Sequence, residues 1–152
     1  MSSRIIGDTF FTDRLIRFSY CDPAGIVFYP QYFVMFNGLV EDWFNQGLRV
    51  DFAGYITKQR RGWPMAALNC EFMVPSKIGE IITLSLKVES LGRSSLKLRV
   101  GCHNEAQERV RANLVLVTLD LDSGRSVPLP DDLRQKMMSF QGSKLDTNSY
   151  DT

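Results

Sequence analysis

A strongly apolar helix is the feature that most constrains how this chain can fold. Residues 30–46 begin with Pro30, which suits the first turn of a helix, and are followed by Gly47, which is typical of a helix end. The first half of this segment is apolar on nearly all sides. Its apolar residues are Tyr32, Phe33, Val34, Met35 and Phe36. We therefore expect the rest of the chain to enclose most of this helix.

Much of the remaining chain has the alternation of apolar and polar residues that is typical of half-buried strands. The alternation is clearest at residues 82–89 and 96–102, and Gly92 and Arg93 lie in the short turn between these two segments. Two alternating segments joined by so short a connection predict an antiparallel hairpin.

Three other segments indicate further strands. Residues 110–121 carry apolar side chains on both faces, as expected of a central strand or of a strand covered by an interface. Residues 65–74 alternate loosely, and residues 13–20 are predicted to form the opening strand. The resulting order of strand, helix and four strands predicts an α+β fold. In this fold, one long helix packs across a curved, mostly antiparallel sheet of five or six strands.

The length and the charge of the chain limit its class. Its 152 residues suit a single domain, which we expect at residues 1–138, followed by a polar, loosely docked tail at residues 139–152. The formal net charge of +1 argues against nucleic acid as a partner. A small basic cluster of Lys58, Arg60 and Arg61 has two interpretations, namely solvated loop residues or contacts to a ligand phosphate.

The cysteines and the apolar segments indicate the cellular compartment. Cys21, Cys70 and Cys102 are odd in number and widely spaced, so they predict neither a disulfide framework nor a metal site. No apolar run has the length of a secretory signal or of a bilayer span, and we expect a cytoplasmic protein with no membrane partner. Because neither a phosphate-binding glycine loop nor metal-ligand spacing occurs, we expect no metal and no cofactor.

The segment between the opening strand and the helix holds the clearest candidate for chemistry. An acidic residue, two prolines and a glycine fix a turn within residues 19–30, and Asp22 lies there close to the amino end of the helix. Free N–H groups and the helix dipole at such an end would stabilise the developing oxyanion of a thioester carbonyl, which a nearby carboxylate could attack. The alternative interpretation is that Asp22 is only a turn or capping residue, as in most Asp-Pro pairs.

Other catalytic arrangements have less support. His103 is the single histidine, so any Ser-His or Cys-His scheme must use it, yet no serine or cysteine neighbours it in a recognisable nucleophile motif. It lies on the polar side of its strand, and we interpret it as a surface or hydrogen-bonded residue. Glu41 and Asp42 are adjacent on the helix and point to different faces, so we interpret them as structural.

Residues 20–32, with the sequence YCDPAGIVFYPQY, resemble the active-site segment of the 4-hydroxybenzoyl-CoA thioesterase family, which has the hotdog fold. The resemblance extends over residues 13–138. It includes Gly62-Trp63-Pro64, Arg93-Ser94-Ser95 and Val127-Pro128-Leu129-Pro130. It implies an acyl-CoA thioesterase, a hydrolase that releases a free acid and CoA, and it fits the order of elements predicted above.

The resemblance also implies roles for individual residues. Asp22 would act on the thioester either as a nucleophile or as a general base toward water, and the backbone N–H of Tyr29 would polarise the thioester carbonyl. Gly25 would allow the substrate to approach closely. Because thiolate is a good leaving group, no dedicated general acid is required.

Further residues would contact the substrate. Phe28 and Trp63 would lie in the acyl pocket, and Pro30 would be among the substrate-binding residues beside them. Arg93 and Ser94 would hold the nucleotide of CoA, where a basic residue suits phosphate. The best-known aromatic acyl-CoA members of the family carry several basic residues in this turn, whereas here Arg93 follows an apolar residue and a glycine. The identity of the acyl group does not follow from these residues.

The resemblance finally implies an oligomer. Hotdog domains pair into dimers whose sheets join edge to edge with the site at the junction, and the dimers often assemble into tetramers. Each site would therefore use residues of both chains. The alternative function is a non-catalytic hotdog module that binds acyl-CoA or serves as an oligomeric scaffold.

Overall fold

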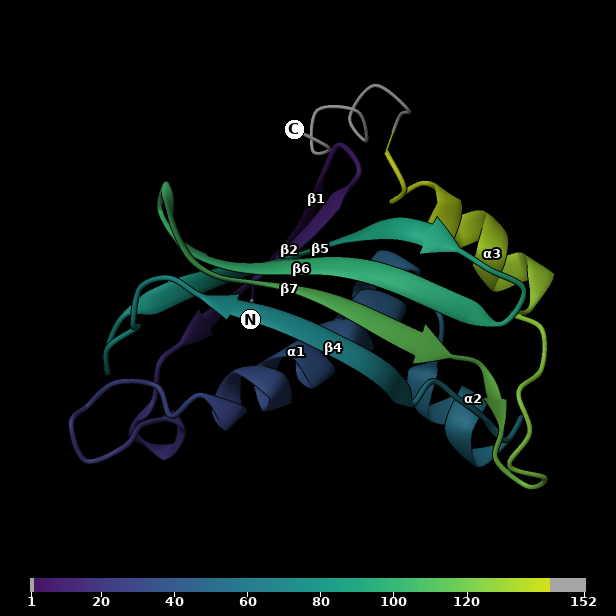
Figure 1. Cartoon of the computed structure of the whole chain (residues 1–152). Helices are drawn as coiled ribbons and strands as arrows, with labels where there is room; N and C mark the ends of the chain where they lie inside the picture. Colours follow the sequence, from purple (N-terminus) through teal and green to yellow (C-terminus); the bar gives the residue numbers. More distant parts are fainter. Residues whose placement is uncertain (1, 143–152) are drawn as a thin grey trace.

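The computed structural model describes residues 2–142, which form one antiparallel sheet wrapped around a long helix (Figure 1). The strands are β1 (Ser3–Ile6), β2 (Thr9–Leu15), β3 (Arg61–Gly62), β4 (Met65–Phe72), β5 (Ile81–Leu91), β6 (Ser95–Asn104), β7 (Gln107–Val117) and β8 (Leu119–Asp120). The helices are α1 (Pro30–Asp42), α2 (Phe52–Thr57) and α3 (Asp131–Met138). The main sheet has six strands in the order β1-β2-β5-β6-β7-β4, and β3 pairs with β8 in a small second sheet. The predicted α+β arrangement is confirmed.

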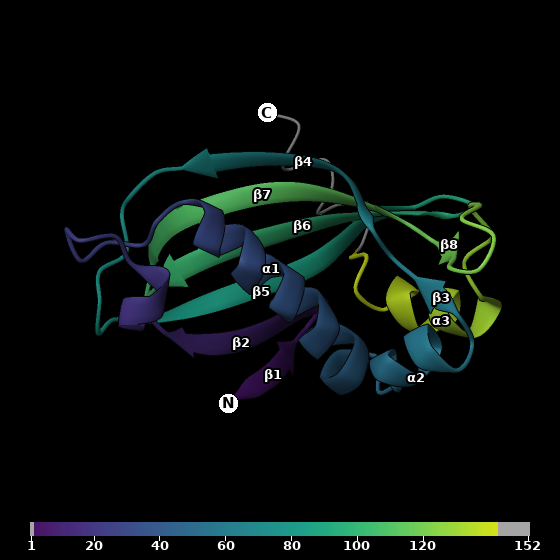
Figure 2. The ribbon, with the colours of Figure 1, turned by 90° about the horizontal axis from the view of Figure 1, so that it is seen from below.

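Helix α1 lies across one face of the sheet (Figure 2) and forms the centre of the core. It starts at Pro30 as predicted, and it continues beyond Asp42 as a π-helical turn over Trp43–Gly47. At Gly47, a β-carbon would lie 2.8 Å from the Trp43 ring. The residue at this position must therefore be small because the Trp43 indole occupies the space beside it.

The β5–β6 hairpin forms the centre of the main sheet, and β5 contacts α1. Its strands pair in the antiparallel register Leu84↔Cys102 and Leu86↔Val100, as the alternation predicted. The alternating apolar side chains from Ile82 to Val88 and from Leu96 to Cys102 are buried, whereas the residues between them lie on the other face. Burying one face of each strand fixes this register, since a slip of one residue would expose every apolar side chain.

Two predicted strands need correction. The opening strand is β2 at Thr9–Leu15, and the chain at Phe18–Tyr20 forms a 3-10 turn in place of the strand expected up to residue 20. The strand expected over residues 110–121 is divided at Thr118, whose N–H donates to the carbonyl of Ser94 at 2.7 Å. Before this break, β7 is a central strand between β6 and β4, which was one of the two interpretations of its apolar faces.

The end of the described chain packs against the core. The ring of Phe140 is buried and lies 5.7 Å from the ring of Trp43, and its carbonyl accepts the N–H of Val88 at 2.9 Å. The rest of the tail predicted at residues 139–152 lies outside the described residues from position 143 onward. Within residues 2–142, no helix has both the length and the apolar character needed to cross a membrane.

The two edges of the main sheet differ in length and in surroundings. The short strand β1 forms one edge, and the longer strand β4 forms the other. Most residues of β4 are exposed, and within residues 2–142 it pairs only with β7. A long strand with one unpaired side offers a row of N–H and C=O groups to another chain.

Candidate active site

The Asp22 loop, residues 22–28, is held in a defined turn in front of α1. The N–H of Asp22 donates to the carbonyl of Ile26 at 2.9 Å, and the N–H of Gly25 donates back to the carbonyl of Asp22 at 3.0 Å. Gly25 has a φ of +78°, a left-handed conformation that favours glycine. The structure therefore gives Gly25 a turn-forming role, in addition to any space that it leaves for a substrate.

The Asp22 carboxylate is half-buried and only partly used by its own turn. Oδ1 accepts the N–H of Ala24 at 2.8 Å, which is the turn interaction expected of many Asp-Pro pairs. No hydrogen bond among residues 2–142 uses Oδ2. One oxygen thus fixes the orientation of the carboxylate, and the other remains available for chemistry.

The amino end of α1 presents an unused donor close to this loop. The N–H groups of Gln31 and Tyr32 donate to the carbonyls of Phe28 and Tyr29 at 2.8 Å and 3.1 Å. The N–H of Tyr29, at the start of the helix, donates to no acceptor within the described part of the chain. Helix dipole and free N–H together favour a negative charge at this point.

Aromatic side chains around this helix end are exposed. Phe28, Tyr29 and Phe72 are 50%, 57% and 50% exposed. The Tyr29 ring centroid lies 5.4 Å from that of Phe28 and 6.2 Å from that of Phe72, so the start of α1 contacts the end of β4. Large apolar side chains gathered on a surface mark a site that binds a ligand or another chain.

Trp63 lies at the opposite end of α1. It is buried, its Nε1 donates to Thr118 Oγ1 at 3.0 Å, and its ring packs 4.7 Å from that of Phe44. A cavity of about 100 Å³ lies beside it. Its lining residues are Asn37, Val40, Glu41, Phe52, Trp63, Pro64, Met65 and Leu116. The lining is mostly apolar, with one carboxylate and one amide, as in many small-molecule sites.

The side chains of Glu41 and Asp42 point in different directions, as their adjacent positions on the helix predicted. Asp42 forms an ion pair with Arg14 of β2 and is structural. Glu41 lies at the cavity beside Trp63, which the sequence interpretation did not anticipate. Neighbouring helix positions point about 100° apart, so only one of the two carboxylates reaches this cavity.

Arg93 and Ser94 lie at the Trp63 end as well. The carbonyl of Ser94 accepts a hydrogen bond from the N–H of Thr118. The hydroxyl of the same Thr118 accepts a hydrogen bond from the indole N–H of Trp63. The carbonyl of Arg93 accepts the N–H of Leu129 at 2.8 Å, and the Arg93 side chain is exposed. The turn is thus held by its backbone, and the guanidinium faces solvent.

The predicted site residues therefore form two groups within one chain. Asp22, Gly25, Phe28, Tyr29 and Pro30 lie at the start of α1, which we call the Asp22 end. Trp63, Arg93 and Ser94 lie at the finish of the helix, which we call the Trp63 end. Pro30 and Phe44 are separated by about 20 Å along the helix axis. A single copy of the chain does not bring the two groups together.

The comparison with known families decides the class of the chain. The sequence profile of the thioesterase-like superfamily matches residues 16–137, which is most of the chain. The chain belongs to this superfamily. The predicted resemblance and the predicted class of thioester hydrolase are thereby confirmed. None of the curated protein sequences matched this thioesterase-like chain.

Solved structures share the fold of this thioesterase-like protein. A Pseudomonas aeruginosa protein has 23% identity and a TM-score of 0.77, with coverage of 88% of this chain and 92% of its own. A 1,4-dihydroxy-2-naphthoyl-CoA thioesterase from Synechocystis has 19% identity, a TM-score of 0.76, and coverage of 89% and 99%. A Staphylococcus aureus protein solved in complex with CoA has 12% identity, a TM-score of 0.79, and coverage of 92% and 88%. These likenesses confirm the hotdog fold.

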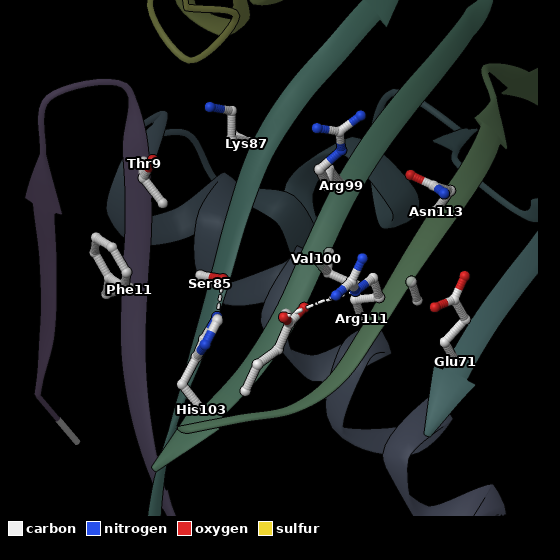
Figure 3. A pocket seen from close by; sticks show the side chains of 13 residues that line it. Thr9, Phe11, Glu71, Ser85, Lys87, Arg99, Val100, His103, Arg111 and Asn113 are labelled. Carbon is white, nitrogen blue, oxygen red and sulfur yellow. Dashed lines mark hydrogen bonds and ion pairs between the residues drawn. The ribbon is translucent and has the colours of Figure 1, made fainter. Parts of the chain in front are cut away.

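A larger hollow of about 640 Å³ lies on the sheet face that α1 does not cover (Figure 3). It contains none of the predicted site residues of this thioesterase-like protein. Within it, His103 Nε2 lies 3.4 Å from Ser85 Oγ, and Arg111 forms an ion pair with Glu108 at 2.8 Å. Lys87 and Arg99 also have carboxylate partners. Because most charged side chains of this face pair with one another or with neighbouring residues, we place the candidate site at α1.

The cysteines offer no activated nucleophile. Burial raises the pKa of the Cys102 thiol to about 12, and burial followed by the neighbouring Asp22 charge raises the pKa of the Cys21 thiol. Both thiols therefore remain protonated near neutral pH. Within residues 2–142, no three histidine, cysteine or acidic side chains lie close enough to hold a metal ion.

Sequence analysis missed the polar group that supports the Asp22 loop from behind. Arg109 of β7 is buried and forms an ion pair with Glu80 at 2.8 Å. Arg109 is 29 positions from Glu80, and no local pattern links the two residues. Arg109 lies just before the strand predicted at residues 110–121, among other polar residues, so its sequence context does not mark it as buried.

Proposed function

We propose that this protein is an acyl-CoA thioesterase whose active site is completed by a second copy of the chain. The observation that carries the proposal is the division of the site residues between the two ends of α1, with the unpaired edge of β4 running from one end to the other. Met65, at the start of β4, lines the cavity beside Trp63, and Phe72, at its finish, contacts Tyr29.

Antiparallel pairing of β4 with β4 of a second copy would join the two groups. Such a pairing is symmetric, and it sets the start of each strand against the finish of the other. The Trp63 end of one chain would then lie beside the Asp22 end of its partner. Two equivalent sites would form in each dimer, and the exposed rings of Phe28, Tyr29 and Phe72 would be covered.

The chemistry follows from the Asp22 end. The carbonyl oxygen of the thioester would accept a hydrogen bond from the Tyr29 N–H. The negative charge that develops on this oxygen would then be stabilised at the helix start. Asp22 would attack the carbonyl carbon directly or remove a proton from an attacking water. In both routes the C–S bond breaks and the CoA sulfur leaves as thiolate. In the general-base route, the oxygen of the attacking water enters the released acid. Direct attack forms an acyl–Asp22 anhydride, and water that attacks the Asp22 carbonyl carbon of this anhydride leaves an Asp22 oxygen in the released acid. Single turnover in heavy-oxygen water separates the routes, because only direct attack transfers an Asp22 oxygen to the first product.

The Trp63 end would bind the substrate on both sides of the reacting carbon. The cavity of about 100 Å³ beside Trp63 is proposed as the acyl pocket, and the exposed Arg93 guanidinium as the contact to a CoA phosphate. Phe28 and Pro30 would line the entrance from the Asp22 end. The naphthoyl-CoA activity named for the Synechocystis structure and the CoA bound in the Staphylococcus structure support this assignment.

A second candidate function is a module that binds acyl-CoA without turnover. It is favoured by the turn at residues 92–94, where Arg93 is the single cation. Calorimetry with a non-hydrolysable acyl-CoA analogue, beside the activity assay, distinguishes the two functions. Tight binding with no thiol release would support the module.

The experiment that tests the proposal is a thiol-release assay across short, medium, branched and aromatic acyl-CoAs. Asp22→Asn is expected to lower kcat by roughly 10²- to 10⁴-fold, because the carboxylate that attacks or activates water is lost. Asp122→Asn is the matched control, since this carboxylate is 68% exposed and pairs with Arg60 beside the β3–β8 sheet, outside the Asp22 loop. Hydrolysis by Asp22→Asn at the wild-type rate would sink the assigned role.

A further inference from the structure

A bulge in β7 directs an arginine into the interior behind the Asp22 loop. Cys102 pairs with Val110, but His103 pairs with Glu108, so Arg109 is an extra residue on β7. Bulges re-aim side chains in this way and are frequent beside active sites. As a result, the charged Arg109 is only 7% exposed and is buried beside the apolar Val110.

Every nitrogen of the Arg109 guanidinium donates a hydrogen bond. Nη1 donates to Pro75 O at 3.1 Å, to Ser76 Oγ at 3.2 Å and to Glu80 Oε1 at 3.1 Å. Nη2 donates to Glu80 Oε2 at 2.8 Å, and Nε donates to Gln107 Oε1 at 2.7 Å. Three of the four partner residues lie within residues 73–80, the loop between β4 and β5, which we call the 73–80 loop.

Glu80, the last residue of this loop, makes further hydrogen bonds that hold the loop in place. Its carboxylate accepts the N–H of Lys77 at 2.6 Å and the side-chain amide of Asn104 at 2.7 Å, besides both Arg109 contacts. The hydrogen bond from Arg109, more than any other contact, lowers the pKa of Glu80 to about 2. The pair is therefore fully charged at any pH near neutrality, and its two parallel hydrogen bonds fix direction as well as distance.

Backbone hydrogen bonds connect the 73–80 loop to the Asp22 loop. The N–H of Val27 donates to the carbonyl of Ser76 at 3.0 Å, and the N–H of Ile78 donates to the carbonyl of Gly25 at 2.9 Å. Residues 25–27, which these bonds hold, are the ones that close the turn around Asp22. Hydrogen bonds and the short backbone segments between them thus connect Arg109 to the turn that carries Asp22.

We propose that the Arg109–Glu80 pair is a positioning device that fixes Asp22 relative to the Tyr29 N–H, so that it controls the rate of the chemical step without contacting the substrate. The inference rests on the proposed function. A displacement of about 1 Å in a reacting group can cost on the order of 100-fold in rate. The Asp22 loop consists of turn residues and needs contacts from outside the loop to avoid such a displacement. The Arg109–Glu80 pair supplies these contacts through the 73–80 loop.

The test compares two glutamates that pair with arginines of the same strand. Glu80→Gln keeps the size of the side chain but removes the charge that Arg109 binds. Glu108→Gln is the control, because it removes the exposed ion pair with Arg111 and leaves the 73–80 loop intact. In the full-length protein, Glu80→Gln is expected to lower kcat by roughly 10- to 100-fold and to change KM by less than about 3-fold. Glu108→Gln should match the wild type.

Amide hydrogen exchange supplies a readout that does not depend on activity. Glu80→Gln is expected to speed exchange at Val27 and Ile78 by about 10-fold or more, while the amides of the β5–β6 hairpin keep their protection. In an Asp22→Asn background, Glu80→Gln should cause no further loss of the residual rate, since the pair acts through Asp22.

The outcomes separate the positioning role from the proposed activity. Unchanged kcat and unchanged exchange in Glu80→Gln would overturn the inference, and so would a uniform rise of exchange over the whole sheet, which indicates general destabilisation. If the wild type hydrolyses no thioester but exchange rises selectively at the Asp22 loop, the proposed function fails while the support of the loop stands. Should Glu80→Gln fail to fold, Arg109→Lys keeps the charge but loses the two parallel hydrogen bonds, and the same measurements apply.

Discussion

The two ends of α1 are stabilised in different ways. At the Trp63 end, the rings of Trp43, Phe44, Trp63 and Phe140 interlock and are buried. At the Asp22 end, hydrogen bonds and one ion pair hold the loops, and the rings of Phe28, Tyr29 and Phe72 lie exposed. Apolar packing gives stability, whereas directional polar contacts fix the position of a reacting group. In the proposed function, the Asp22 end carries the chemistry, whereas the Trp63 end stabilises the fold and also binds the substrate.

Replacing an aromatic residue with alanine should lower stability much more at the Trp63 end than at the Asp22 end. Trp63→Ala is expected to lower the free energy of unfolding by about 3–5 kcal/mol, because it leaves a cavity and an unpaired Thr118 hydroxyl. Phe28→Ala, which removes a ring that is half exposed, should cost about 1 kcal/mol or less. Urea denaturation measures both. Similar losses for the two variants would contradict the proposed difference between the ends.

The two edges of the sheet should respond differently to a charge. Phe72→Glu, at the finish of β4, is expected to convert a dimer into a monomer and to lower kcat/KM by about 100-fold or more, because each site would lose its second half. Ile6→Glu on β1 is the control, since Ile6 is 62% exposed on the opposite edge. Sedimentation and the thiol-release assay report the two effects. A fully active monomer would exclude the shared site.

Acid should remove the stability that Glu80 contributes at the Asp22 end. The folded-state pKa of Glu80 is depressed from 4.5 to about 2, so its contribution to stability is fully present above pH about 4.5 and is lost as the pH falls through about 2. We expect this contribution to reach roughly 3 kcal/mol at most. The difference in unfolding free energy between wild type and Glu80→Gln should therefore shrink as the pH is lowered from 6 to 2. A difference that stays constant over this range would show that the ion pair contributes no stability.

The smallest expected effect lies in the turn at the Trp63 end. Arg93→Ala should raise KM for acyl-CoA by about 3- to 10-fold with kcat nearly unchanged, because an exposed cation contacts the carrier and not the reacting carbon. Lys136→Ala, on the exposed side of α3, is the control. An unaltered KM in Arg93→Ala would remove this residue from the site.

The sequence predicted the parts of the fold that have strong periodicity. The apolar run behind Pro30 and the alternation on both sides of Gly92 each repeat over several turns or residues, so α1 and the β5–β6 hairpin were expected in the right places. Helix α3 was not predicted, because its eight residues bury only Leu133 and Met137. Strand β1 was missed too, since it exposes most of its side chains.

The site was predictable only where its residues are consecutive. The motif around Asp22 is continuous in the chain, and its turn has the expected form. The Arg109–Glu80 pair depends on a bulge that shifts the register of β7 by one residue, and such a shift has no local sequence pattern. Glu41 reaches its cavity only because α2 and the segment before β4 pack beside α1, which is a tertiary effect.

The placement of the two half-sites at opposite ends of one chain has a genetic consequence. A dimer built from an Asp22→Asn copy and a copy damaged at the Trp63 end contains one site with both lesions and one with neither. Two inactive alleles expressed together should therefore complement each other, and random pairing would restore about one quarter of the wild-type sites. Two alleles damaged at the same end should give no complementation, so the thiol-release activity of mixed and matched pairs would map each residue to its proposed half-site.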